Sequence, residues 1–284
     1  MQPIRVLVTG AGAPGFWGTF KSLVNNYDNR EVHIVATDAK KIDGCMARQF
    51  YQIPMANEEG YLDTICKIYQ DEKIDILLPQ NTMELETLAN SEMNVCVSKR
   101  VGIANNKSSL YKIAKDCKVP IPKSMRINGK AVIKPVVGHG SKGLKIIEDG
   151  EWLVSEFIEG DEYTIDCYRD NEQFIAIPRI RDEIKNGISW ETTTVERKDL
   201  IEYSKRLAEE LDLKYAFGFQ FIGDKLLECN PRVQGTMITS TFAGANLIYS
   251  AVKSAFGEKV PKLKAEWGTK VIRQSVCKPL YKGY

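Results

Sequence analysis

The sequence lacks a long apolar run and a marked excess of either charge. No hydrophobic stretch approaches the roughly 20 residues that a transmembrane helix requires, so we expect no membrane partner. The 39 basic and 37 acidic residues nearly cancel, leaving a formal net charge of +2. Such a balance gives no overall attraction to nucleic acid, and we expect no nucleic-acid partner.

The cysteines never occur in the close pairs that are typical of zinc sites or redox motifs. There are seven of them in 284 residues, an odd number without CxxC spacing, which predicts reduced thiols in a cytoplasmic protein. The first residues enter a strand at once instead of forming a secretory leader, in agreement with a cytoplasmic location. The scattered cysteines are Cys45, Cys66, Cys96, Cys117, Cys167, Cys229 and Cys277.

Short apolar runs alternate with helical segments in the first third of the chain. The runs cover residues 4–8, 32–36 and 74–79, and we predict helices through 20–24 and over roughly 58–71. Strands that alternate with helices favour a parallel sheet with right-handed crossovers. We therefore predict a small Rossmann-like domain over residues 1–97.

Later segments predict a different architecture, so the fold class is α/β with a large α+β part. A helix over 107–118 stops before Pro120 and Pro122, since proline cannot continue a helix. Four short β-type runs follow, and we predict a linker helix and a small β-rich lid lobe over 98–160. A C-terminal α+β lobe should cover 161–284, with a helix and three strands at 198–211, 216–222, 225–229 and 269–276.

The turn after the first strand contains a glycine fingerprint. Gly10, Gly12 and Gly15 match G-x-G-x-x-G, and Asp38 closes the second strand where a ribose-binding acid would lie,. One interpretation is therefore an NAD(P)-dependent oxidoreductase, although nothing later in the chain supplies a hydride-transfer site. The motif also suits a tight strand-to-helix turn or a substrate-binding loop, and the candidates for substrate binding are Gly12, Ala13, Pro14 and Asp38.

A second glycine loop follows an apolar strand that ends at Lys134. Gly138, Gly140 and Gly143 surround Ser141 and Lys142, and such a loop can present backbone N–H groups and an ammonium to a polyphosphate. A plain hairpin turn would have the same pattern. Lys107, near the start of a helix, is a further candidate for phosphate binding, although an ordinary solvated charge also explains it.

Oxygen donors occur on two neighbouring predicted strands near the C-terminal end. Gln220, Glu228 and Asn230 are the hard ligands that Mg²⁺ prefers, and Glu228 and Asn230 lie two residues apart on one strand face,. Arg232 is suited to stabilise a transferring phosphoryl group. A strand end followed by a polar turn is the competing interpretation.

Taken in their order along the chain, the motifs of this sequence resemble those of the ATP-grasp superfamily. They are Lys107, Lys134-Pro135, Gly138–Gly143, Glu156-Phe-Ile-Glu-Gly-Asp-Glu162, Gln220 and Glu228-Cys-Asn-Pro-Arg232. The set is most similar to the branch of the carbamoyl-phosphate synthetase large subunit and related carboxylate–amine ligases. The resemblance covers nearly the whole chain.

The resemblance implies an ADP-forming ligase that works through an acyl phosphate and uses ATP with Mg²⁺, two ions in number, for which Mn²⁺ can substitute. Its substrates would be a small carboxylate and an amine, with an amino-acid or peptide-like ligase favoured, and a homodimer is left open. Lys107, Lys134 and the 138–143 loop would bind the phosphates. The other implied roles are adenine binding by Glu156, Phe157 and Ile158, ribose binding by Glu162, metal binding by Gln220, Glu228 and Asn230, catalysis by Arg232, Lys134 and Arg181, and substrate binding by Arg179.

The lid departs from the family pattern. Only about 10 residues separate the glycine loop from the strand that ends at Phe157, where relatives usually carry a helix. A lid this small makes a low-turnover ATP-binding regulatory protein a third interpretation. For Arg179 and Arg181, a strand-edge salt bridge is as consistent with the sequence as substrate binding.

Overall fold

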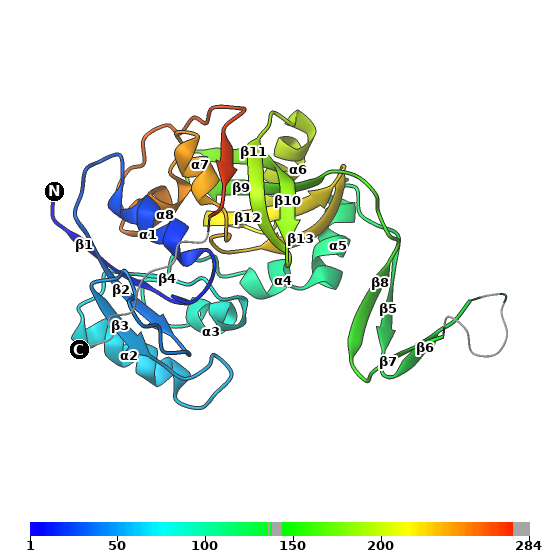
Figure 1. Cartoon of the computed structure of the whole chain (residues 1–284), viewed down its shortest axis with the longest axis horizontal. Coiled ribbons are helices and arrows are strands. Elements are labelled where there is room, and N and C mark those ends of the chain that lie inside the picture. Colours follow the sequence, from blue (N-terminus) through cyan, green and yellow to red (C-terminus); the bar gives the residue numbers. More distant parts are fainter. Residues whose placement is uncertain (136, 138–143, 275–284) are drawn as a thin grey trace.

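The N-terminal part of the chain forms a parallel sheet flanked by helices (Figure 1). The computed structural model describes residues 1–135, 137 and 144–274. Its first sheet has the order β3-β2-β1-β4, and every pairing is parallel, which confirms the Rossmann-like prediction. The elements are β1 (Ile4–Val8), α1 (Phe16–Val24), β2 (Val32–Asp38), β3 (Gln49–Gln52), α2 (Tyr61–Asp71), β4 (Ile76–Leu78), the 3₁₀ helix η1 (Thr82–Glu84) and α3 (Leu85–Ala89).

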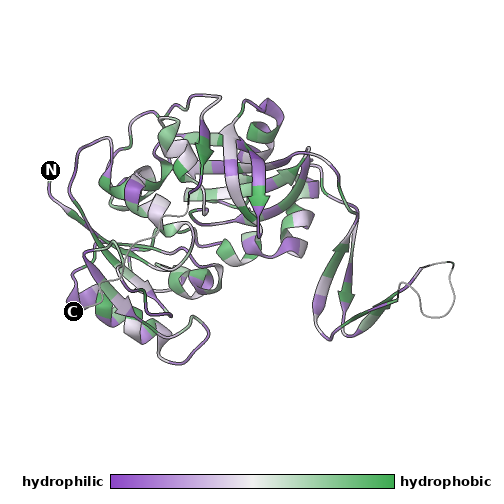
Figure 2. Cartoon of the chain, viewed as in Figure 1, coloured by the Kyte–Doolittle hydropathy of each residue, from purple (hydrophilic) through white to green (hydrophobic). Residues whose placement is uncertain are grey.

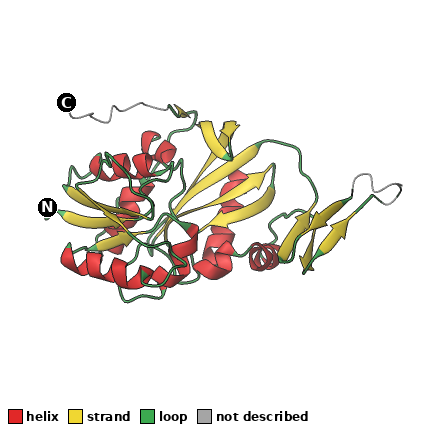
Figure 3. Cartoon of the chain, turned by 60° about the horizontal axis from the view of Figure 1, so that its bottom comes forward, coloured by secondary structure: helices red, strands yellow, loops and turns green. Residues whose placement is uncertain are grey.

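A narrow arm follows the N-terminal unit and projects from the body of the molecule (Figures 1 and 3). It consists of two antiparallel ladders, β5 with β8 and β6 with β7. A two-stranded ladder has no second layer to cover it, so Met125, Val132 and Ile146 remain exposed. Figure 2 shows hydrophobic positions interspersed along the arm. Its strands are β5 (Ser124–Asn128), β6 (Ala131–Ile133), β7 (Lys145–Ile147) and β8 (Glu151–Ser155).

The remaining strands form an antiparallel sheet in the order β13-β12-β9-β10-β11-β14. The long hairpin β10–β11 and helices α7 and α8 extend beyond the elements that we predicted from the sequence. The elements of this lobe are α4 (Val101–Asn105), α5 (Lys107–Asp116), β9 (Glu162–Arg169), β10 (Phe174–Lys185), β11 (Ile188–Thr194), α6 (Lys198–Glu210), β12 (Tyr215–Ile222), β13 (Lys225–Asn230), α7 (Ile238–Phe242), α8 (Leu247–Ala255) and β14 (Lys270–Ile272).

Helices cover both faces of the antiparallel sheet. On one face, Leu110 of α5 and Leu207 of α6 pack with Phe217 of β12. Helix α5 therefore packs on the C-terminal lobe, although from the sequence we grouped it with the lid. None of the helices in the described ranges has the length and apolarity needed to cross a membrane.

The opposite face of the same sheet shares a core with the N-terminal unit. Leu247 and Val252 of α8 belong to one buried cluster with Val6 of β1, Ile34 of β2 and Tyr168 of β9. Helix α8 is buried on most sides because it lies between the two sheets. This common core fixes the glycine loop after β1 against the end of β13, where the candidate site lies.

Candidate active site

Three predicted oxygen donors meet on the β12–β13 ladder. Gln220 lies directly opposite Glu228, and Gly218 lies opposite Asn230. Alternation along the strand brings Glu228 and Asn230 to one face, where Asn230 Nδ2 donates to Glu228 Oε1 at 3.2 Å. The antiparallel register thus brings together the three side chains that the sequence pattern indicates as metal ligands.

Two cations flank these donors. Lys107 Nζ lies 3.0 Å from Glu228 Oε2, because α5 packs alongside β13. The guanidinium of Arg232 donates to Thr82 Oγ1 at 3.0 Å, to the carbonyl oxygen of Val233 at 3.0 Å and to Asn230 Oδ1 at 3.3 Å. Burial lowers the pKa of Arg232 below its ordinary value. Thr82 comes from the N-terminal unit, so both parts of the molecule hold this arginine.

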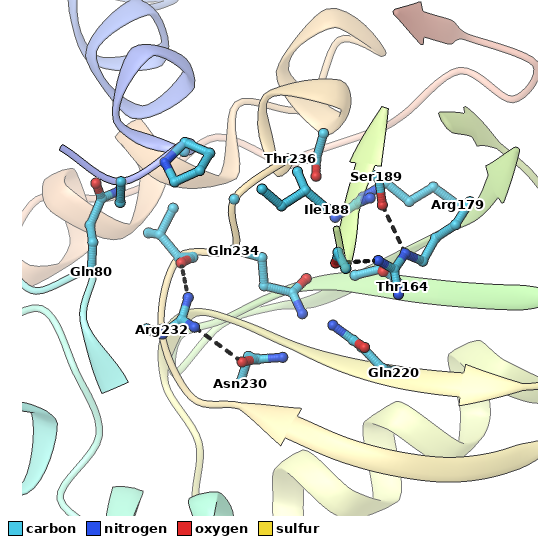
Figure 4. A pocket seen from close by; sticks show the side chains of 17 residues that line it. Gln80, Thr164, Arg179, Ile188, Ser189, Gln220, Asn230, Arg232, Gln234 and Thr236 are labelled. Atoms are coloured by element: carbon cyan, nitrogen blue, oxygen red, sulfur yellow. Dashed lines mark hydrogen bonds between the residues drawn. The ribbon is translucent and has the colours of Figure 1, made fainter. Parts of the chain in front are cut away.

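A pocket of about 270 Å³ opens above this ladder (Figure 4). Gln220, Asn230 and Arg232 line it together with Ala13 and Pro14 of the first glycine loop. The pocket therefore joins the predicted metal and phosphoryl centre to part of the predicted substrate loop.

Several buried polar groups that line the pocket have no partner in the described structure. Gln234 is only 6% exposed, and neither its Oε1 nor its Nε2 makes a hydrogen bond. Its side chain extends toward Gln220 and Asn230 (Figure 4). Gln80 Oε1 and Arg179 Nη1 are likewise buried and unpartnered. Buried polar groups are normally satisfied, so these atoms indicate a place where a ligand would supply the missing bonds.

Arg179 is almost fully buried and forms an ion pair with Asp166. Its Nε and Nη2 donate to the two carboxylate oxygens at 2.9 and 3.2 Å, and Ser240 Oγ donates to Asp166 Oδ2 at 2.7 Å. Among the donor nitrogens of the Arg179 guanidinium, Nη1 is the one without a partner in the described structure. The principal contact of Arg179 is this salt bridge. From the sequence, a salt bridge and substrate binding were the two interpretations of Arg179.

Arg181 and Glu162 contact each other. Arg181 Nη1 lies 2.7 Å from Glu162 Oε2, and the same guanidinium donates to Ser189 Oγ at 2.9 Å and to the carbonyl oxygen of Gly187 at 2.6 Å. Burial lowers the pKa of Arg181, and Glu162 counteracts this effect. A ribose that bound Glu162 would have to share this carboxylate with Arg181.

The predicted nucleotide-binding residues at the base of the arm lie apart from the pocket lining. Glu156 Oε1 accepts from Lys225 Nζ at 2.5 Å and from the Lys123 N–H at 3.1 Å, and these bonds lower the pKa of Glu156. The side chain of Phe157 is exposed, and neither Phe157 nor Ile158 lines the pocket.

Lys134 follows β6 on the outer part of the arm, so the structure does not bring it next to Arg232 or the β12–β13 ladder (Figure 1). The phosphate-binding and catalytic role of Lys134 stays a prediction. The predicted phosphate-loop residues Gly138, Gly140, Ser141, Lys142 and Gly143 lie outside the described residues.

The first glycine loop is held by the carboxylate of Asp38. Asp38 Oδ2 accepts from the Gly12 N–H and Oδ1 from the Lys40 N–H, both at 2.8 Å. Asp38 and Gly12 are thus bound to each other and do not line the pocket, and their substrate role stays a prediction. A Cβ on Gly15 would lie 2.7 Å from the Cα of Gly235, so Gly15 permits close packing between the two parts of the chain.

The donor set suits Mg²⁺. No group of three or more histidine, cysteine, aspartate or glutamate side chains in the described part of the chain could hold a metal by itself. Gln220, Glu228 and Asn230 supply one carboxylate and two amide oxygens. Such a set fits Mg²⁺ that is bound jointly with substrate phosphates. In this structure the ammonium of Lys107 balances the charge of the single carboxylate, Glu228.

Four residues of the site, Gln80, Thr82, Asp166 and Gln234, were not predicted from the sequence. Gln234 follows Arg232 by two residues, and this proximity was the one available signal. Asp166 lies within an apolar strand, where a carboxylate demands a buried partner. Gln80 and Thr82 reach the site only because the end of β4 packs beside Arg232 and the first glycine loop.

Two family models match the sequence. The model described as ATP-grasp in the biosynthetic pathway with Ter operon matches residues 148–276. The model of the PylC-like N-terminal domain matches residues 6–103. No match was found among curated proteins.

Solved structures with the same fold cover most of the chain. N5-carboxyaminoimidazole synthetase from Staphylococcus aureus, complexed with ADP, is 14% identical with a TM-score of 0.65, covering 92% of this chain and 80% of its own. L-amino acid ligase from Bacillus licheniformis is 10% identical with a TM-score of 0.65, covering 90% and 74%. An ATP-grasp superfamily protein from Archaeoglobus fulgidus is 17% identical with a TM-score of 0.60, covering 92% and 90%. At such identities the likeness concerns the fold.

Proposed function

Because this chain belongs to the ATP-grasp superfamily, we propose that it is an ATP-dependent, ADP-forming ligase that joins a carboxylate to an amine. The observation that carries the proposal is the position of Gln220, Glu228 and Asn230 on one ladder, with Lys107 and Arg232 bound beside them. Hard oxygen donors next to cations suit a nucleoside triphosphate and its metal ion.

The proposed reaction has two steps. A carboxylate oxygen attacks the γ-phosphorus of ATP, the bond to the β–γ bridging oxygen breaks, and ADP leaves with that electron pair. The amine nitrogen then attacks the acyl carbon, the bond from this carbon to the phosphate oxygen breaks, and inorganic phosphate leaves. The nitrogen loses a proton as the amide forms. Mg²⁺, when bound, would neutralise charge on the phosphate oxygens.

The residues of the chain orient and stabilise these groups. Gln220, Glu228 and Asn230 would hold the metal, and Lys107 would turn from Glu228 to the phosphates when the metal binds. Arg232, fixed by Thr82 and Asn230, offers a preorganised cation to the charge that develops on the transferred phosphoryl group. Positioning and electrostatics carry most of the rate in phosphoryl transfer, so the proposal requires no nucleophilic side chain.

An amino-acid or peptide-like carboxylate is the substrate class that we favour. The L-amino acid ligase among the structural neighbours supports this choice. The neighbouring pocket offers an arginine nitrogen and amide groups that could bind a carboxylate and an amine.

A low-turnover ATP-binding protein is the second candidate. The observation that favours it is the narrow arm, which projects from the body of the molecule (Figure 1), while Lys134 is not among the residues that line the pocket. Both candidates predict Mg-ATP binding, but only the ligase predicts carboxylate-dependent release of ADP.

Incubation of the purified protein with Mg-ATP and pools of amino acids tests the proposal. We expect ADP and phosphate to form in equal amounts together with an amide product, and Glu228→Gln to reduce the rate about 100-fold or more. Glu172→Gln is the matched control, because Glu172 also pairs with a lysine, Lys259, at 3.0 Å but lies on an exposed turn. Undiminished Mg-ATP binding and turnover in Glu228→Gln would contradict the assignment.

A further inference from the structure

A second and larger pocket adjoins the candidate active site. Its volume is about 540 Å³, and it lies between the start of α1, the strands β11 and β14 and the helix α7. Apolar and aromatic side chains make up most of its wall, among them Trp17, Trp190, Ile238, Phe242, Val271 and Ile272. We call it the apolar pocket.

The apolar pocket and the active-site pocket share a wall. Pro14, Gly235 and Thr236 line both of them. Arg273 holds this wall in place, because its Nη1 donates to the Pro14 carbonyl oxygen at 2.6 Å and its Nη2 to the Gly235 carbonyl oxygen at 3.0 Å. A molecule seated in one pocket therefore lies next to the other.

The shared wall has no side chain at Gly235. A Cβ at this position would meet no atom within 4 Å, so a side chain there would project into open space beside the pockets. On its other side Gly235 approaches Gly15 closely. The absence of a side chain at residue 235 keeps room for a ligand that extends from one pocket to the other.

The wall of the apolar pocket exposes large hydrophobic groups. Trp17 is 48% exposed, Phe242 is 56% exposed and Ile272 is 53% exposed. Grouped exposure of this kind marks binding sites more often than scattered single residues do. Removal of this surface from water by an apolar ligand would be favourable, and aromatic walls suit aromatic or branched aliphatic groups.

The polar groups of the adjoining active-site pocket indicate which hydrogen-bonding groups the polar end of such a ligand carries. Arg179 Nη1 is a buried donor without a partner, which suits a carboxylate, whereas Gln80 Oε1 and Gln234 Oε1 are buried acceptors, which suit an N–H group. One α-amino acid carries both groups on neighbouring atoms. Its side chain would then extend across the Gly235 wall.

We propose that the substrate is an α-amino acid with a bulky apolar side chain, which occupies the apolar pocket while its carboxylate and amine bind in the active-site pocket. This proposal rests on the proposed ligase function and narrows its substrate class. The apolar pocket would discriminate between amino acids with large and small apolar side chains, since each additional buried methylene group raises the specificity constant by about tenfold or more.

Calorimetric titration with single amino acids, in the presence of Mg-ADP, tests the proposal without requiring turnover. We expect phenylalanine or leucine to bind at least about 10-fold more tightly than alanine. Gly235→Val should reduce this ratio by about tenfold, because the new side chain fills the space at the shared wall. Trp17→Ala should also reduce the ratio, whereas Trp267→Ala, which removes a similarly exposed tryptophan outside the pocket, should leave the ratio unchanged.

Two different failures are distinguishable. If Mg-ADP binds but phenylalanine and leucine bind no more tightly than alanine, or if Trp17→Ala keeps the wild-type ratio, the substrate proposal is overturned while the ligase function stands. If neither Mg-ADP nor Mg-ATP binds, the proposed function itself is wrong, and the substrate proposal falls with it.

Discussion

The ammonium of Lys107 lies 3.0 Å from the Glu228 carboxylate, so a phosphate-binding candidate and a metal-ligand candidate neutralise each other. Both side chains are partly exposed, with 52% and 32% of their surfaces accessible, and an exposed pair of this kind contributes little to stability. The contact is therefore easily exchanged for a metal ion and a phosphate.

Lys107→Met should have opposite effects on two ligands. Mn²⁺ alone should bind a few-fold more tightly, by about 2–5-fold, because the ammonium no longer competes for Glu228. Mg-ATP should bind more weakly, because a cation near the phosphates is lost. Titration of each ligand provides the measurement, with Lys259→Met as the control. Weaker Mn²⁺ binding in Lys107→Met would show that the lysine does not compete with the metal.

Arg232→Lys should lower the rate of ADP formation by about 100-fold while it changes Mg-ATP affinity less. Lysine keeps the charge but loses the planar fork that contacts Thr82 and Asn230. Steady-state measurement of kcat and KM separates the two effects. Arg169→Lys is a matched control, since Arg169 likewise bridges a side chain, Asp212, and a carbonyl oxygen on the surface. A pure change in KM would argue against a role in the transition state.

Gly15→Ala should destabilise the protein by about 1–3 kcal/mol. The added Cβ would lie 2.7 Å from the Cα of Gly235, and backbone cannot move aside as a flexible side chain can. Gly235→Ala is the matched control, because its Cβ would meet nothing within 4 Å; we expect a change within about 0.5 kcal/mol. Urea unfolding of the two variants is the measurement, and equal stability of both would contradict the close packing.

Glu84 predicts a specific pH dependence of stability. Burial raises the pKa of its carboxyl above the ordinary 4.5, although Tyr61 and two backbone N–H groups donate to it. The folded state therefore binds this proton more tightly than the unfolded state does. The stability that proton binding at Glu84 adds to the folded state is complete below pH 4.5. It is lost as the pH rises through the raised pKa of this carboxyl,.

Comparison of the wild-type protein with Glu84→Gln isolates this contribution. The stability of the wild-type protein relative to the variant should fall with increasing pH, by at most about 1.4 kcal/mol per pH unit. Urea unfolding at a series of pH values measures it, and Glu59→Gln, at an exposed position, is the control. A relative stability that increases with pH would show that the pKa of Glu84 is lowered instead.

Local patterns in the sequence were sufficient to predict many of the elements and the order of the chemical motifs. Strands β1, β2 and β4 are short apolar runs, and their alternation with helices predicted the parallel sheet. The shared face of Glu228 and Asn230 was also predictable, because the two-residue period of a strand depends only on local backbone geometry. These are properties that neighbouring residues set among themselves.

Contacts between distant residues, in contrast, follow only from the tertiary packing. Arg232 contacts Thr82, 150 positions away, and Gly15 contacts Gly235. The strand pattern around Arg179 could not identify Asp166 as its buried partner. Helix α8 and the two sheets share one core, and the wall between the two pockets brings Pro14 together with Gly235 and Thr236. Such contacts depend on how whole elements fill space together, which no local pattern of residues specifies.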